Sequence, residues 1–198
     1  MTTLLLTRHG ETIDNVKHII QGQSQGELNE KGIQQMIGLR ERLKHEPIQA
    51  FVASDLKRSY ESCEIIAEPH GIEVYQTPLL RERDCGSFTG RYIPEIGQDE
   101  PWPTDMETLP QLLERANNFL NEIMEKYPNK TVFAVGHGII NKAIQSVYFN
   151  KPIHKVPKMN NAELRELKLH PERGGYFVSP ENMIETLSMK GKFDEFTK

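Results

Sequence analysis

The segment Leu4-Leu5-Leu6-Thr7-Arg8-His9-Gly10-Glu11-Thr12 predicts a buried β-strand that ends in an arginine, a histidine and a glycine turn. In open α/β sheets, the loops beyond the carboxyl ends of the strands converge into one crevice, where the chemistry takes place. An imidazole there can act as a nucleophile, and the adjacent guanidinium can hold an anionic substrate. On this segment alone, a histidine that only forms loop hydrogen bonds is the simpler interpretation of His9.

Two further apolar runs also end in cationic or potentially cationic side chains. Residues 50–53 form one run, and Arg58 follows it about one turn inside the next helix. Residues 131–135 form the other run, and His137 follows it between two glycines. Together with the first strand, these strand ends predict one positively charged pocket, which favours a functional role for His9.

Apolar residues in two segments recur with the period of a helix. One helix is predicted to open at residues 29–32, although Gly32 and Gly38 weaken it, and its shared face comprises Ile33, Met36, Ile37 and Leu43. The clearest helix has an apolar face of Leu112, Ala116, Phe119, Leu120, Ile123 and Tyr127. Its polar residues fall off that face, and they are Glu114, Arg115, Asn118, Glu122 and Glu125.

The remaining elements complete an alternation of strands and helices. The helix that contains Arg58 is expected to end near Pro69 and Gly71. Another buried helix is expected after Gly138, with its N-terminal amides at the crevice. Further strands are predicted over residues 163–169, 176–178 and 184–187. This alternation predicts an α/β fold with three α/β/α layers around a mostly parallel sheet, in a single domain over residues 1–198.

Composition narrows the class of protein. The 198 residues carry a net charge of −4, which argues against electrostatic binding to nucleic acid. No apolar run reaches membrane-spanning length, and the first residues form a strand pattern instead of a signal peptide. Cys63 and Cys85 are the two cysteines. We therefore expect a soluble, reduced, cytoplasmic protein, and its oligomeric state does not follow from the sequence.

Five motifs follow one another along the chain: Arg8-His9-Gly10-Glu11-Thr12 with Asn15, Gln21-Gly22, Ser54-Asp55-Leu56-Lys57-Arg58, Leu80-Arg81-Glu82 followed by Gly86 and Gly90, and Gly136-His137-Gly138. In this order they resemble the histidine phosphatase superfamily, in the branch that contains the cofactor-dependent phosphoglycerate mutases and small bacterial phosphatases. The resemblance extends from Leu4 to about Leu169. It implies a phosphoglycerate mutase-like fold.

Side-chain chemistry and the resemblance together suggest roles for the cationic residues. His9 is the candidate nucleophile, because a neutral imidazole can attack phosphorus and form a phosphohistidine that water then hydrolyses. Neighbouring positive charges would lower its pKa. Arg8 and Arg58 can hold phosphate oxygens, with surface salt bridging as the alternative for each. His137 would donate a hydrogen bond to the transferring group, with a buried structural histidine as the alternative.

Glu82 is the candidate acid and base, which would protonate the leaving oxygen and then activate water. The first step requires a protonated carboxyl group, so we expect surroundings that oppose its ionisation. The resemblance favours Glu82 over the nearby Asp84, and solvated surface charge is the alternative role. Four more residues are assigned to phosphate or substrate binding, mostly on the resemblance, and they are Asn15, Gln21, Gly22 and the amide of Gly138.

Two departures from the family pattern bear on activity. Where the family often has Gly-aromatic and then Asp-x-Pro-Leu-Thr, residues 22–29 are Gly-Gln-Ser-Gln-Gly-Glu-Leu-Asn. Residues 89–108, which we call the lid segment, hold three prolines without a regular period and predict a short irregular lid. The mutases carry a longer insertion there that encloses a bisphosphorylated intermediate and excludes water. A short lid implies an open pocket and transfer to water.

These observations predict a phosphomonoesterase that hydrolyses a phosphorylated small molecule without a metal or another cofactor. The histidines are dispersed, and no cysteine or carboxylate cluster has the spacing of metal ligands. A cofactor-dependent phosphoglycerate mutase is the alternative enzyme, and a phosphate-binding pseudoenzyme is the alternative without catalysis. The substrate does not follow from the sequence, because the catalytic residues set the reaction class and the lid sets specificity.

Overall fold

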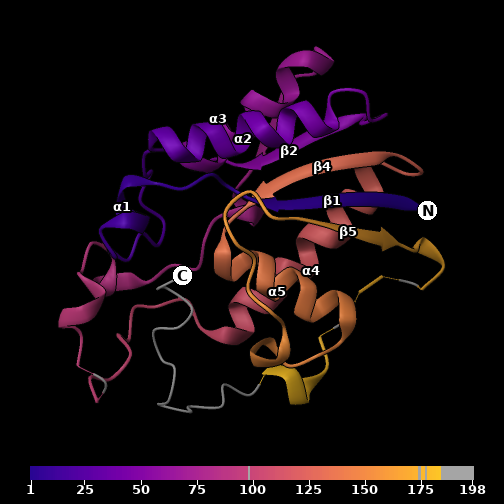
Figure 1. Ribbon diagram of the computed structural model, residues 1–198. Helices are drawn as coiled ribbons and strands as arrows, with labels where there is room; N and C mark the ends of the chain where they lie inside the picture. Colours follow the sequence, from indigo (N-terminus) through magenta and orange to yellow (C-terminus); the bar gives the residue numbers. More distant parts are fainter. Residues whose placement is uncertain (98, 174, 177, 184–198) are drawn as a thin grey trace.

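The computed structural model describes residues 1–97, 99–173, 175–176 and 178–183 and contains a five-stranded sheet of order β3-β2-β4-β1-β5. Its strands are β1 Thr2–Arg8, β2 Ala50–Ser54, β3 Val74–Thr77, β4 Thr131–Gly136 and β5 Leu164–Leu169. The pairs β1·β4, β2·β4 and β2·β3 are parallel, and β5 is antiparallel to β1 (Figure 1). The prediction of a mostly parallel sheet is therefore confirmed.

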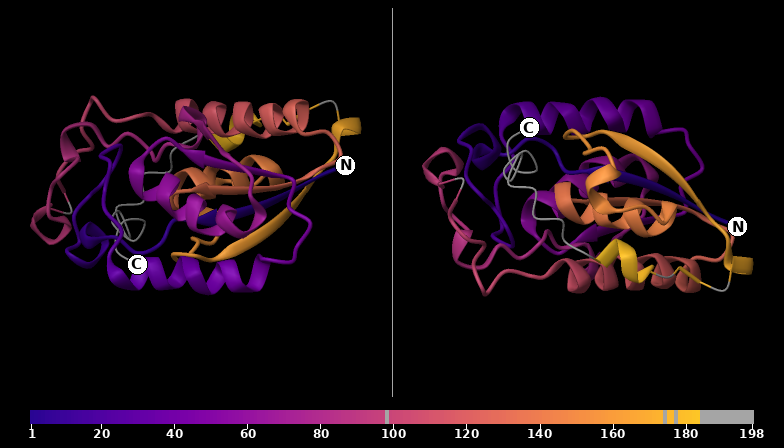
Figure 2. Two further views of the ribbon diagram at one scale, coloured as in Figure 1. Left: turned by 90° about the horizontal axis from the view of Figure 1, so that it is seen from above. Right: turned by 90° about the horizontal axis from the view of Figure 1, so that it is seen from below.

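Helices cover both faces of this sheet. On one face lie α2 Glu30–Leu43 and α3 Lys57–Ala67, and on the other lie α4 Leu109–Lys126 and α5 Gly138–Phe149 (Figure 1). Both views of Figure 2 show α2 and α4 on opposite sides of the strands. Successive strand side chains enter different cores: Leu4 and Leu6 pack with α4 and α5, whereas Leu5 packs with α2 and α3. The three predicted layers follow from this alternation.

The helices match the predicted patterns with one correction. In α4 all of the apolar residues on the predicted face are buried except Tyr127, which is partly buried against the same core. Thr108 caps this helix and forms a capping box with Gln111. In α2 the prediction for Ile33 is wrong, because its side chain is 39% exposed while Leu39 is buried.

The strand β3 was not expected from the sequence, and only Val74 and Thr77 of its four residues are buried. Two further strands that the sequence predicts are not found among the described residues. The strand expected over residues 176–178 includes Phe177, which lies outside the described residues, and Tyr176 and Val178 belong to no strand. The strand expected over 184–187 lies wholly outside the described residues. The helix α3 ends at Ala67, before a short 3-10 turn that contains Pro69, as predicted.

The lid segment has a small apolar core of its own. Its described residues form loops and the 3-10 turn Ile93–Glu95. The cluster beneath it consists of Ile20, Cys85, Phe88, Ile93, Ile96 and Met106, with Trp102 packed against it. Backbone hydrogen bonds join Gly90 to Ile20, and an isolated bridge joins Ile19 to Tyr92. The lid segment is thereby attached to the loop that follows β1.

No helix of the described residues is both long and apolar enough to cross a membrane.

Two glycines of α2 have opposite surroundings, and together they test how closely α2 packs against the loop after β1. A Cβ on Gly32 would lie 2.1 Å from the carbonyl oxygen of Glu11, whereas a Cβ on Gly38 would meet nothing within 4 Å. We predict that Gly38→Ala raises the free energy of unfolding by up to about 1 kcal/mol, the helix propensity difference. Gly32→Ala should lower it by more than about 1 kcal/mol. Urea denaturation of both variants measures the two changes, and equal effects would contradict the close contact.

Candidate active site

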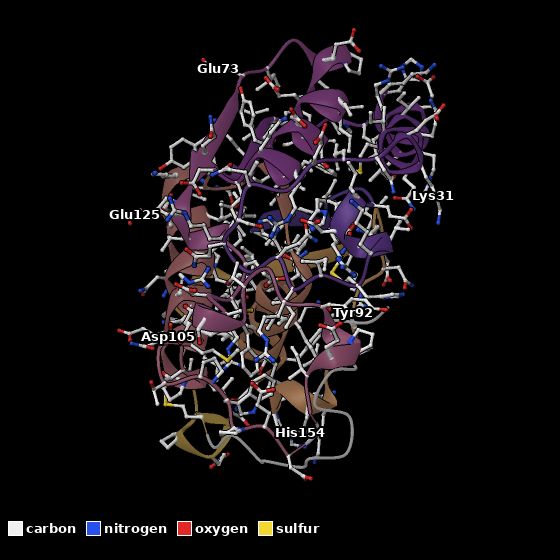
Figure 3. The ribbon with its side chains drawn as sticks, turned by 90° about the vertical axis from the view of Figure 1, so that its left-hand side faces the viewer. Lys31, Glu73, Tyr92, Asp105, Glu125 and His154 are labelled. Atoms are coloured by element: carbon white, nitrogen blue, oxygen red, sulfur yellow. The ribbon has the colours of Figure 1, made fainter. Side chains whose placement is uncertain are left out.

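One pocket at the carboxyl ends of β1 and β4 collects most of the predicted site residues. It is lined by Arg8, His9, Asn15, Ile19, Ile20, Gln21, Gly22, Arg58, Glu82 and Gly138. His137 is not among the lining residues but lies directly behind them, with its ring centroid 5.1 Å from that of His9. Figure 3 views the molecule from this end, with Tyr92 and Asp105 of the lid segment facing the viewer. All nine predicted site residues are therefore brought together.

His9 is held as a neutral imidazole with one free nitrogen. Its Nδ1 atom lies 2.7 Å from the carbonyl oxygen of Gly10, which can only accept, so Nδ1 carries the proton. The other nitrogen, Nε2, is then unprotonated and available for attack. The pKa of His9 is well below 6.5, first because the ring is buried and then because Arg58 and Arg8 are close. His9 has the protonation state that a nucleophile needs at neutral pH.

His137 is fully buried at the N-terminus of α5. Neither ring nitrogen has a hydrogen-bond partner among the described residues. Burial lowers its pKa well below 6.5, and Arg58 and His9 lower it further. A buried polar group without a partner is costly. A ligand with acceptor oxygens would supply the missing partner, and this fits the predicted hydrogen bond to a phosphoryl group better than a structural role.

Arg58 is oriented by the backbone of the loop that departs from the family pattern. Its side chain is only 1% exposed, so the alternative of a surface salt bridge is wrong. Its guanidinium donates hydrogen bonds to the carbonyl oxygens of Gly22, Ser24 and Gln25. Burial lowers the pKa of Arg58 to about 10, which still leaves it charged at neutral pH.

Arg8 reaches the same pocket from the end of β1. Its Nη1 donates to the carbonyl oxygen of Met159 over 3.1 Å. Burial lowers its pKa, and the nearby Glu82 carboxylate opposes that shift. Arg8 and Arg58 therefore place two buried guanidinium groups beside His9.

Three backbone amides hold the carboxylate of Glu82. It accepts hydrogen bonds of 3.1 Å from the amides of Ile139 and Ile140, and one of 2.9 Å from the amide of Arg83. These donors fix its position at the N-terminus of α5, and the expectation that its surroundings oppose ionisation stays a prediction. The amides at the start of α5 do point at the pocket, as predicted, and they donate hydrogen bonds to the carboxylate of Glu82. In contrast, Asp84 accepts from the amide of Gly86 within a turn.

The arginines on either side of Glu82 point away from it. Arg81 pairs with Asp55 through two hydrogen bonds of 2.8 and 2.6 Å. Arg83 donates from Nε to the carbonyl oxygen of Glu107. The predicted alternation of side chains along this extended segment is confirmed, and Glu82 alone of these three residues lines the pocket.

Asn161 is a site residue that the sequence did not reveal. Its amide donates to the carbonyl oxygen of His9 over 2.9 Å and lies 3.5 Å from Oδ1 of Asn15. The next residue, Ala162, has a φ of 58° and donates from its backbone to the carbonyl oxygen of Arg8. Adjacent asparagines signal a turn, but nothing local indicates a partner 152 residues away.

A buried hydroxyl also joins two parts of the site. Ser62 accepts from the amide of Gly10 and donates to the carbonyl oxygen of Arg58. The loop that carries His9 and the helix that carries Arg58 are thus connected through one side chain.

Among the described residues, no group of three His, Cys, Asp or Glu side chains is arranged to hold a metal ion.

Comparisons with known proteins agree with this geometry. A metal-independent phosphoserine phosphatase of Arabidopsis thaliana is 36% identical over 160 residues, which cover 73% of this chain and 67% of that protein. A probable phosphoglycerate mutase GpmB of Cronobacter sakazakii is 30% identical over 167 residues, 78% of each chain. A mycobacterial glucosyl-3-phosphoglycerate phosphatase in complex with VO3 superposes with a TM-score of 0.78 at 26% identity, covering 84% of this chain and 92% of that one.

The family model described as histidine phosphatase superfamily (branch 1) matches residues 4–179. This match includes every residue assigned above to the pocket. The chain belongs to the histidine phosphatase superfamily.

Proposed function

We propose that the protein is a phosphomonoesterase that transfers the phosphoryl group of a small-molecule phosphate first to His9 and then to water. The observation that carries this proposal is the buried pair of neutral imidazoles, His9 and His137, between two charged guanidinium groups. Such a pocket suits an anion with several acceptor oxygens. The phosphatases among the similar proteins support hydrolysis as the reaction.

In the first step, Nε2 of His9 attacks phosphorus, the bond from phosphorus to the leaving oxygen breaks, and Glu82 protonates that oxygen. The charge of a bound phosphate favours the protonated form of a nearby carboxyl group. In the second step, water attacks the phosphohistidine, Glu82 accepts its proton, and inorganic phosphate leaves. Arg8, Arg58 and His137 stabilise the transferring group in both steps.

A phosphoglycerate mutase is the second candidate, because GpmB-type relatives carry that name. A mutase has to hold the phosphorylated enzyme and its partner molecule away from water. The lid segment spans only residues 89–108, and a short lid fits water entry better than the longer insertion of the mutases. A phosphate-binding pseudoenzyme stays the alternative without catalysis. We also propose that the protein is cytoplasmic and that residues 1–198 form one domain. Both cysteines, Cys63 and Cys85, are free in the structure.

We predict a covalent phosphate on His9 during turnover. Phosphohistidine survives alkali and breaks in acid, so brief reaction with 32P-labelled substrate followed by an alkaline quench should leave label on the protein. His9→Ala should carry none, since it lacks the nucleophile. The control is His154→Ala, which replaces a histidine that does not line the pocket and should keep the label. Label retained in His9→Ala would refute the assignment.

Phosphate release should continue in EDTA, because Arg8, Arg58 and His137 supply the positive charge and donors that a metal would otherwise contribute. A strong loss of activity in EDTA that magnesium or zinc restores would contradict this mechanism.

In the same assay, 3-phosphoglycerate with a trace of 2,3-bisphosphoglycerate should give little 2-phosphoglycerate. Isomerisation faster than phosphate release would favour the mutase.

The orientation of Arg58 can be tested at a glycine that touches it. A Cβ on Gly26 would lie 2.7 Å from Oε1 of Gln21 and 2.8 Å from Cδ of Arg58, and the φ of Gly26 is +67°. Gly71 has a φ of +64° with nothing within 4 Å, so it is the matched control. Both alanine variants suffer a left-handed strain of about 1–2 kcal/mol. Only Gly26→Ala should lower kcat/KM, by about tenfold or more, through a weakened charge-assisted contact to phosphate. Steady-state kinetics measures this, and equal losses would disprove the orienting role.

A further inference from the structure

We propose that Arg115, with its partner Glu107, is a positioning residue for the catalytic acid Glu82. This inference rests on the proposed function. Arg115 lies on α4 and was expected only as a polar residue off the apolar face of that helix. It touches no substrate in the proposed mechanism, and its effect would come through the segment that carries Glu82.

Arg115 holds three residues of that segment by their carbonyl groups. Its Nη1 donates to the carbonyl oxygens of Leu79 and Arg81, and its Nη2 donates to that of Glu82. The side chain is only 16% exposed. Residues 81–85 belong to no helix or strand. Their path therefore depends on such side-chain contacts, because no ladder of backbone hydrogen bonds sets it.

Glu107 makes this contact rigid and extends it beyond Glu82. Its carboxylate accepts from Nε and Nη2 of Arg115 over 2.8 and 2.7 Å. It also accepts from the amide of Asp84. The amide of Glu107 donates to the carbonyl oxygen of Asp84, and its carbonyl oxygen accepts from Nε of Arg83. The pair thus holds the chain on both sides of Glu82. A two-pronged contact of this kind restricts an arginine far more than a single charge would.

The two ends of Glu82 are consequently held by different helices. Arg115 of α4 holds its carbonyl group, and the amides of Ile139 and Ile140 at the start of α5 hold its carboxylate. These helices pack against each other in one core. Together with the side chain of Gln23, which also donates to the carbonyl oxygen of Glu82, Arg115 fixes the backbone from which the carboxyl group is aimed at the leaving oxygen. General acid catalysis depends strongly on this aim.

The leaving group distinguishes this role from a merely structural one. The leaving group of an alkyl phosphate is a strongly basic alkoxide, which needs a proton from the acid. The leaving group of p-nitrophenyl phosphate is p-nitrophenolate, which is stable as an anion and needs no acid. In single-turnover experiments that follow phosphoryl transfer to His9, Arg115→Lys should slow transfer from glycerol 3-phosphate by about 10–100-fold, as expected for a displaced catalytic group. Transfer from p-nitrophenyl phosphate should change by less than about threefold, because the phosphate contacts remain.

Arg165→Lys is the matched control. Arg165 pairs with Glu163 and donates to the carbonyl oxygens of Pro157 and Lys158, which is the same kind of contact at a place that does not touch Glu82. Any loss in this variant should be equal for the two substrates. If Arg115→Lys does not fold, as judged by circular dichroism, then Glu107→Gln decides. It should show the same selectivity for the alkyl substrate with a smaller loss.

Equal loss with both substrates in Arg115→Lys, or in Glu107→Gln where the first does not fold, would overturn the proposal, and so would no loss. Failure of the proposed function gives different results. Absence of alkali-stable label on His9 would refute the phosphohistidine mechanism. Equal slowing of both substrates in Glu82→Gln would refute the acid assignment itself. Selective loss in Glu82→Gln and in Arg115→Lys, but not in Arg165→Lys, would establish the positioning role.

Discussion

Two arginines and two histidines are buried together where β1, β2 and β4 end, and the molecule has to accommodate this like charge away from water. It does so by keeping both imidazoles neutral, since burial and the guanidinium groups lower the pKa of His9 and of His137. It keeps Arg58 charged, with a pKa of about 10. The result is a pocket whose donors and charge are already in place for a phosphate group. Little reorganisation is then needed when the substrate arrives.

The burial of these groups places demands on the surrounding backbone. Carbonyl oxygens of the loop after β1 surround Arg58, and the carbonyl oxygen of Met159 accepts from Arg8. Glycines allow this loop to approach so closely, with Gly26 directly against the Arg58 side chain. The loop of residues 22–29, which departs from the family pattern, is therefore the one that orients the buried side chain of Arg58.

Glu82 is held at both of its polar ends. The amides of Ile139 and Ile140 donate to its carboxylate, and Arg115 donates to its carbonyl oxygen. In the proposed mechanism, the negative charge of a bound phosphate favours the protonated carboxyl group. Substrate binding and activation of the acid are linked in that mechanism, and the proposed role of Arg115 is to keep the segment in position.

Local chemistry explains what could be predicted from the sequence. Apolar runs, glycine turns and helical periods depend on neighbours a few residues apart, so they predicted the strands β1, β2, β4 and β5, the helices α2 to α5 and the order of the motifs, but not β3. They also placed Arg8, His9 and His137 at strand ends. Only the tertiary structure decided the exposure of Ile33, the helix amides around Glu82, and the contacts of Asn161 and Arg115. These depend on hydrogen bonds between residues far apart in the chain, up to 152 positions for Asn161 and His9, and no local pattern records such a partner.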